Sequence, residues 1–298
     1  MEPVPVCPMS DIKRILLLTD CAGCSEGAIR EAIKLSSRCE AALYAMAEVS
    51  SNPDYEMISP HDFQEMERQT AARLDSIKKT AQRCGVACEV ILFHGESPYN
   101  DVVQQVKRLN IDLIVIERHE YKGFIKWLMR GVVVNIVGVA PCRVLVVPKE
   151  ARIEGKKVLI ATDGSRHSMA AAAEGVGIAK RLGSGIIVLS CVGNSGGDEL
   201  SKAISNIDIV CKMAEGISSV ETLTPVGRPS ETIVEAASTK GVDLIVMGSY
   251  GKTGIKELLM GSTTEKVISH AACAVLVVRD RRQKSWTGIN SISKSYLQ

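Results

Sequence analysis

The residues with the clearest chemistry form a glycine-rich loop in the second half of the chain. From Met247 onward, the segment MGSYGKTGIKELLMGSTTEKVI places Gly248, Gly251 and Gly261 in the pattern G-x2-G-x9-G. Glycine allows positive φ angles and close approach of other groups to the backbone. The pattern ends in the hydroxyl residues Ser262, Thr263 and Thr264. Free N–H groups and hydroxyls at a helix start suit phosphate oxygens, so the loop predicts a phosphate site, to which Lys252 would add a charge. An ordinary glycine-rich turn is the alternative.

An aspartate far away in the sequence is expected to complete this site. Asp163 ends the apolar run KKVLIATD, 85 positions before Gly248 ends the run DLIVMG. In a doubly wound sheet the first and fourth strands are neighbours, and ligands bind where the winding direction changes. We therefore expect Asp163 and the glycine loop to meet in one crevice.

Two other nucleotide-binding motifs are excluded by their spacing. Gly251-Lys252-Thr253 resembles the end of a P-loop, but Val246 stands where that motif requires its first glycine. The first strand of this half leads into Asp163-Gly164-Ser165 and not into G-x-G-x-x-G, which excludes the dinucleotide-binding turn.

The elements that must position these residues occur twice in the chain. A strand runs into Thr-Asp at Asp20 and again at Asp163, and the run DLIV begins at Asp112 and again at Asp243. Each copy closes with a short apolar strand, CRVLVVPK in one and CAVLVVRD in the other. Offsets of 143 and 131 positions show that the second copy is about a dozen residues shorter.

Apolar strands alternate with helical segments in each copy, which predicts an α/β fold. We expect two doubly wound, five-stranded parallel sheets of Rossmann-like type, each with strand order 3-2-1-4-5. The expected domains are residues 1–150, residues 155–281 and a polar tail at 282–298. The expected helices of the second copy are 168–182, 197–216, 230–240 and 254–270.

The first copy has lost the glycine loop. Its segment is IERHEYKGFIKWLMRGVVVNIV. Aligned on IKWLMRG, Arg118 stands where the second copy has Gly248 and Tyr121 where it has Gly251; aligned on DLIV, Glu117 stands opposite Gly248. Valines Val132, Val133 and Val134 replace the hydroxyl residues. We expect large side chains, Arg118 and Tyr121 among them, to block this crevice, so that the copy binds nothing or an altered ligand. There are two alternatives: Arg118 could bind a different anion in the crevice, or its side chain could be solvated or ion-paired.

The combined pattern resembles the universal stress protein family. Besides the glycine loop and Thr-Asp, the chain has the G-x-P of Gly227 and Pro229 after the third strand. The resemblance covers both copies, which makes the chain similar to a tandem member. It implies an adenine-nucleotide site for ATP, together with Mg²⁺, and pairing of the two domains through their fifth strands, Val144 to Val147 and Val275 to Val278. A homodimer through other faces stays open.

The resemblance also assigns residue roles in the second copy. Ala161, Thr162 and Asp163 would face adenine and ribose, and Val192 would contact adenine through its backbone. Met247 and Gly248 would line the ribose. The phosphates would be held by Gly251, Gly261, Ser262, Thr263 and Thr264. The function implied is a stress-response regulator or signalling module that binds ATP. Slow ATP hydrolysis at the same site is the first alternative, although only Asp163 offers a general base, and a ligand-free interaction scaffold is the second.

Composition narrows the function classes further. The net charge of +2 gives no field that favours nucleic acid or an anionic membrane. No apolar run approaches the roughly 20 residues needed to cross a bilayer, and the N-terminus has no signal-peptide pattern, which predicts a cytoplasmic protein. The ten cysteines are then expected as free thiols. Cys21 and Cys24 form a lone C-x-x-C at a helix start, a weak redox signal.

Overall fold

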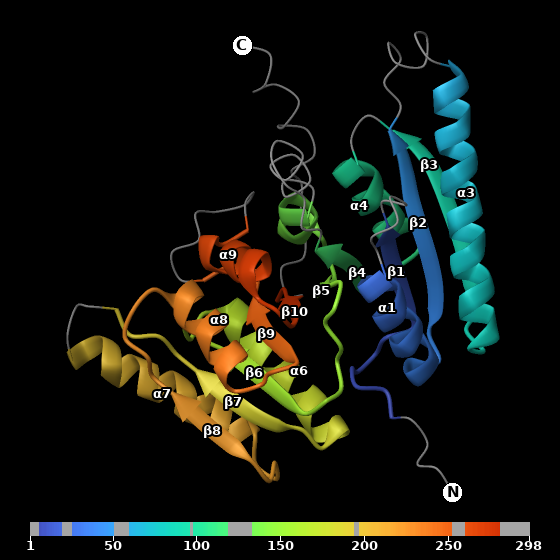
Figure 1. Cartoon of the computed structure of the whole chain (residues 1–298). Coiled ribbons are helices and arrows are strands. Elements are labelled where there is room, and N and C mark those ends of the chain that lie inside the picture. The colour runs from blue at the N-terminus through green and yellow to red at the C-terminus, as the bar shows by residue number, and fades with distance from the viewer. Residues whose placement is uncertain are drawn as a thin grey trace, which may run out of the picture.

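The two copies join into one continuous sheet. The computed structural model describes residues 6–19, 26–50, 60–95, 98–118, 133–193, 197–251 and 260–280. Its ten strands have the order β3-β2-β1-β4-β5-β10-β9-β6-β7-β8. Each copy therefore has the expected order 3-2-1-4-5, and Figure 1 shows the first copy, in blue to green, beside the second, in yellow to red.

The elements of the first copy alternate as the sequence predicts. Its strands are β1 (Arg14–Thr19), β2 (Ala42–Ser50), β3 (Cys88–Gly95), β4 (Leu113–Arg118) and β5 (Arg143–Pro148). Its helices are α1 (Glu26–Cys39), α3 (Pro60–Arg83) and α4 (Pro98–Arg108), and residues 133–139 are also helical.

The second copy repeats this arrangement. Its strands are β6 (Lys157–Ala161), β7 (Gly185–Leu189), β8 (Val220–Leu223), β9 (Leu244–Gly248) and β10 (Ala274–Val278). Its helices are α6 (Arg166–Leu182), α7 (Gly197–Met213), α8 (Pro229–Thr239) and α9 (Ser262–His270). No helix among the described residues is long and apolar enough to cross a membrane.

The closing strands of the two copies form the junction. β10 runs antiparallel to β5, with Val275 opposite Val146 and Val277 opposite Val144. All other strand pairs are parallel. The junction is the pairing of fifth strands that the resemblance implied. Because the two copies run in opposite directions across it, the carboxyl ends of their strands lie at opposite edges of the sheet.

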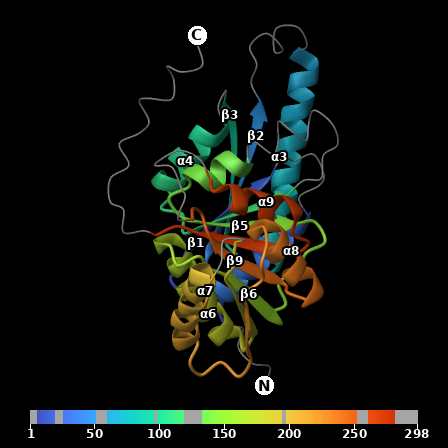
Figure 2. The ribbon, with the colours of Figure 1, turned by 90° about the vertical axis from the view of Figure 1, so that its left-hand side faces the viewer.

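Helices cover both faces of this sheet, as the turned view in Figure 2 shows. Buried residues of α1, α3, α6 and α7 pack with one set of alternating strand residues, such as Leu17 and Ile160. Buried residues of α8, α9 and the helical segment 133–139 pack with the other set, such as Leu16 and Leu159. Burial on both faces explains why the strands read as continuous apolar runs.

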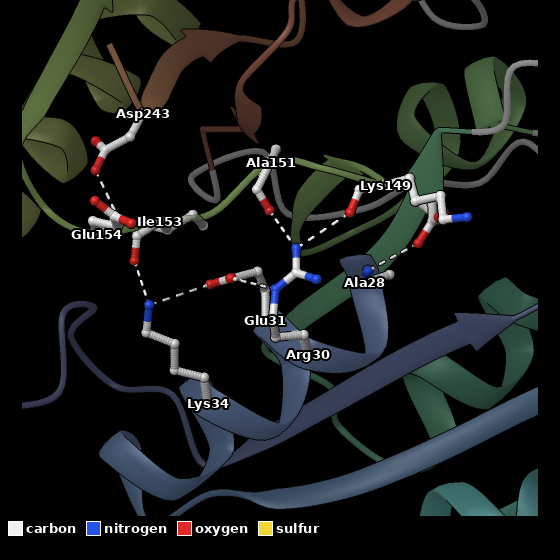
Figure 3. Close-up of polar contacts among 10 residues, drawn as sticks. Ala28, Arg30, Glu31, Lys34, Lys149, Ala151, Ile153, Glu154 and Asp243 are labelled. Carbon is white, nitrogen blue, oxygen red and sulfur yellow. Dashed lines mark hydrogen bonds and ion pairs between the residues drawn. The ribbon is translucent and has the colours of Figure 1, made fainter. Parts of the chain in front are cut away.

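The connection between the copies is held by α1 (Figure 3). Arg30 donates to the carbonyl of Ala151 over 2.6 Å, and Lys34 donates to that of Ile153 over 2.5 Å. Both cations also pair with Glu31, whose side chain is 1% exposed. Ala151 and Ile153 are buried in the core, so the connection between the copies docks onto the first copy.

Two details differ from the sequence-based expectations. Cys7 and Cys39 form a disulfide, so these two are not free thiols as expected, because the N-terminal segment lies against the end of α1. The last helix is expected to run unbroken over 254–270, but Met260 and Gly261 are not helical and α9 begins at Ser262, while residues 252–259 lie outside the described residues. Gly261 before it has an extended backbone, with its N–H bonded to the carbonyl of Ser249. Asp20, Cys21, Cys24, Tyr121 and the tail lie outside the described residues.

Candidate functional site

A cavity of about 880 Å³ lies at the carboxyl ends of the strands of the second copy. Its walls come from the ends of β6, β7 and β9, the start of α9, and one face of α7. The predicted residues that line it are Ala161, Thr162, Asp163, Met247, Gly248, Gly251, Gly261, Ser262, Thr263 and Thr264. The expected meeting of Asp163 with the glycine loop is thus present in the fold.

Asp163 and Gly251 are in close approach inside this cavity. A Cβ built on Gly251 would lie 2.7 Å from Oδ2 of Asp163, so a side chain there would displace the carboxylate. Oδ1 of Asp163 accepts the N–H of Ser165 over 2.9 Å, which fixes the carboxylate at the start of α6. Ser165 is the N-cap of that helix, and its hydroxyl accepts the N–H of Ser168.

Gly248 lets β9 pass directly against α6. A Cβ on Gly248 would lie 2.7 Å from backbone atoms of His167 and Ser168, which cannot move aside as a side-chain tip can. The carbonyl of Gly248 accepts the buried hydroxyl of Thr264 over 3.0 Å. Thr264 therefore ties α9 to β9, and its hydroxyl proton is already used there.

The first turn of α9 lies at the wall of the cavity. The first N–H groups of a helix have no intrahelical partner and carry partial positive charge. Gly261, the N-cap, has no side chain to accept them. Ser262 and Thr263, in the first turn, line the cavity. This turn can receive an anion.

Two predicted residues are not placed in the cavity by the structure. Val192 does not line it, and its N–H and carbonyl are bonded to Pro225 and Gly227 in the extension of β8. Its neighbours Ser190 and Cys191 line the cavity in its stead. Lys252 lies outside the described residues.

A polar stripe on α7 was missed from the sequence. Glu199, Lys202 and Asn206 line the cavity from one face of this helix. Asn206 touches the turn after β6, since a Cβ on Gly164 would lie 2.2 Å from its Oδ1. The spacing of three and four residues was the available signal, but nothing in it shows that the polar face of α7 turns toward the ligand crevice rather than toward solvent.

Tyr250 lines the cavity, and His167 packs against its ring from α6. Their ring centroids lie 5.5 Å apart, and Nδ1 of His167 accepts the N–H of Asp280 over 3.1 Å. Burial, and then the charge of Arg279, lowers the pKa of His167 below its ordinary value. The ring is therefore neutral at pH 7, which its role as acceptor requires.

In the first copy, Glu117 stands at the position of the first glycine. The strand registers align Glu117, opposite Val147 in β5, with Gly248, opposite Val278 in β10. Glu117 is 1% exposed, and its Oε2 accepts the N–H of Ala28 in the first turn of α1 over 3.1 Å. A carboxylate thus lies at the start of α1, where the partial positive charge of a helix N-terminus attracts it.

Arg118, which was expected to block the first crevice, contacts the second copy. Its guanidinium donates to the carbonyls of Ile268, over 3.3 Å, and Ala271 at the end of α9. Carbonyls at a helix C-terminus carry partial negative charge and attract a cation. Arg118 is therefore held by the second copy, and the expectation that it blocks the first crevice stays a prediction, because most of that crevice's loop lies outside the described residues.

The fold is that of a doubly wound α/β protein with a cavity at the switch point of its second copy. The model of the universal stress protein family matches residues 11–148 and again 155–279. The chain belongs to the universal stress protein family, with two copies of its domain.

Relatives and solved structures agree with this assignment. A universal stress protein of Methanocaldococcus jannaschii is 37% identical over 145 residues, which are 43% of this chain and 85% of the relative. A universal stress protein of Thermus aquaticus is 33% identical over 135 residues, which are 42% of this chain and 98% of the relative. The crystal structure of a universal stress protein from Archaeoglobus fulgidus shares the fold, with a TM-score of 0.71, 18% identity and coverage of 91% and 97% of the two chains.

Proposed function

We propose that this protein binds ATP in the cavity of its second copy and serves as a nucleotide-dependent regulator or signalling module. The observation that carries the proposal is one cavity in which Asp163, the glycine loop and the open first turn of α9 meet. A volume of about 880 Å³ is in the range of small-molecule sites. We propose that residues 155–281 form the nucleotide-binding domain, and we assign no role to the tail at 282–298.

The cavity divides into a base-and-ribose end and a phosphate end. Ala161, Thr162 and Asp163 would face the nucleoside, together with Met247 and Gly248. Backbone contact with adenine, expected of Val192, is proposed instead for its neighbours Ser190 and Cys191, since both backbone groups of Val192 are bonded. The phosphates would lie at Gly251, Gly261, Ser262 and Thr263, with Lys252 as a further cation.

Mg²⁺ fits this site as a companion of the phosphates. No group of three or more metal-ligating side chains occurs among the described residues. Mg²⁺ commonly needs only one or two carboxylates besides substrate phosphates and water, and Asp163 and Glu199 line the cavity. When bound, the ion would neutralise phosphate charge.

Slow ATP hydrolysis is the rival function, and Glu199 gives it some support. It is a second carboxylate at the cavity besides Asp163, and a general base must stand near the attacking water. A turnover assay separates the two. A binder returns the nucleotide intact after hours, whereas repeated product release identifies an enzyme.

Gly261→Val is the test of the binding site. Gly261 has φ −58° and ψ 136°, which valine also adopts, and a Cβ there makes only ordinary contacts of 3.4 Å or more. The branched side chain would project where we place the phosphates. We expect calorimetry to show no ATP binding in the variant, while circular dichroism and the melting temperature stay close to the wild type.

Gly177→Val is the matched control. A Cβ on Gly177, in α6, would meet only the flexible tip of Arg181, and Gly177 does not line the cavity. It should bind ATP as the wild type does. If the wild-type protein binds no ATP even when ATP is added in excess, the ATP proposal fails and the scaffold hypothesis is favoured. If Gly261→Val binds ATP with unchanged affinity, the phosphates lie elsewhere.

A further inference from the structure

Tyr250 belongs to the glycine loop of the second copy but is anchored in the first. Its hydroxyl donates to the carbonyl of Gly138 over 3.0 Å, in the helical segment 133–139 of the first copy. The two residues are 112 positions apart. This hydrogen bond ties the rim of the candidate ATP cavity to the neighbouring copy.

Two further side chains fix the ring of Tyr250. The guanidinium carbon of Arg279 lies 5.4 Å from the ring centroid, a cation–π contact. Arg279 also donates to the carbonyl of Ala140, over 3.3 Å, at the end of the same first-copy segment. His167 packs on the ring at 5.5 Å. Tyr250 is thus held between its own domain and the first copy.

The loop transmits the position of Tyr250 to the cavity. Tyr250 lines the cavity itself and is followed directly by Gly251, which abuts the carboxylate of Asp163. On its other side, Ser249 donates to the carbonyl of Val278 and accepts the N–H of Gly261. A shift of Tyr250 would therefore move both Gly251 and the start of α9.

We propose that Tyr250 is a positioning residue through which the first copy sets the geometry of the nucleotide loop in the second. The inference rests on the proposed ATP site. On this proposal the first copy, which lacks the glycine loop, contributes to ATP binding by the second copy. Because coupling between two sites is reciprocal, ATP in the cavity also restrains the first-copy segment at Gly138 and Ala140.

The test replaces Tyr250→Phe in the full chain, which removes the hydroxyl and keeps the ring. Loss of one such hydrogen bond predicts an ATP dissociation constant raised roughly 3- to 10-fold. The second readout is amide hydrogen exchange in residues 133–140 at saturating ATP. Wild-type protein should show slower exchange with ATP than without it, and the variant should show no difference although its site is filled.

Tyr44→Phe is the matched control. Tyr44 lies in β2, and its hydroxyl makes no hydrogen bond with any residue that the structure describes. The control should keep wild-type affinity and the ATP-dependent slowing of exchange. Wild-type affinity in Tyr250→Phe, or slowing that persists there, would overturn the proposal. Absence of ATP binding by the wild type would overturn the proposed function instead, so the two failures are distinguishable.

Discussion

The three glycines of the loop have three different physical roles. At Gly248 a Cβ would strike the backbone of α6, and at Gly251 it would strike the carboxylate of Asp163. At Gly261 a Cβ would fit, so the fold does not require glycine there. Packing alone explains Gly248, whereas Gly261 is the position where a ligand gives the better reason for a missing side chain.

The carboxyl of Glu48 has a raised pKa, which the sequence did not indicate. Burial, and then the negative charge of Asp101, raises the pKa of this carboxyl from 4.5 to about 7. The folded protein holds the proton more tightly than the unfolded chain does. The stabilising effect is therefore complete below pH 4.5 and is lost as the pH rises to about 7.

Glu48→Gln should remove this pH dependence. The variant should match the wild type near pH 4.5 and exceed it at pH 8, by on the order of 1 kcal/mol because the carboxyl is partly solvated. Urea unfolding at several pH values measures it. Glu89→Gln, at an exposed site on the adjacent β3, should leave the profile unchanged. A Glu48→Gln profile parallel to the wild type would contradict the shift.

At the scale of elements, each copy caps a helix of the other. Arg118 of the first copy donates to the carbonyl of Ala271 after α9, and Arg279 of the second donates to that of Ala140 after the segment 133–139. These two alanines occupy equivalent places before the closing strands. Cations at helix C-termini are favourable, and here they also join the domains.

Arg118→Met should destabilise the protein. It leaves the carbonyls of the buried residues Ile268 and Ala271 without this donor, at a cost of about 1–3 kcal/mol. Arg166→Met is the control, since Arg166 is 72% exposed in its ion pair with Asp280 and such pairs contribute about 1 kcal/mol or less. Chemical denaturation compares the two, and equal effects would argue against the cap.

At the scale of the molecule, a largely buried ion pair crosses between the copies. Arg143 at the start of β5 pairs with Glu174 in α6 over 2.8 Å, each side chain 11% exposed. With the shared sheet and the docked connection, this pair predicts that both copies unfold together, in a single transition.

Glu174→Met should cost about 3–5 kcal/mol, because it leaves the Arg143 charge buried and unpaired. The double variant Arg143→Met with Glu174→Met should recover much of that loss, because it removes the uncompensated charge. A double-mutant cycle from denaturation curves measures the coupling. Additive losses, or two separate transitions, would show that the copies are energetically independent.

The sequence by itself determined the repeat, the strand order and most of the cavity wall. These follow from local patterns, namely apolar runs, Thr-Asp and the spaced glycines, because a parallel α/β topology brings strand ends together. The sequence could not show which way the polar face of α7 turns. It also could not show that Glu117, and not Arg118, stands at the position of Gly248. Both depend on packing across the fold.

Only the tertiary structure decided how the copies act on each other. The bonds from Tyr250 to Gly138 and from Arg118 to α9 join residues more than 100 positions apart. Side chains choose such partners by proximity and charge after the sheet has assembled, and no local pattern encodes that choice. The sequence shows that only the second copy keeps the glycine loop. The contacts that link the two copies can be identified only from the tertiary structure.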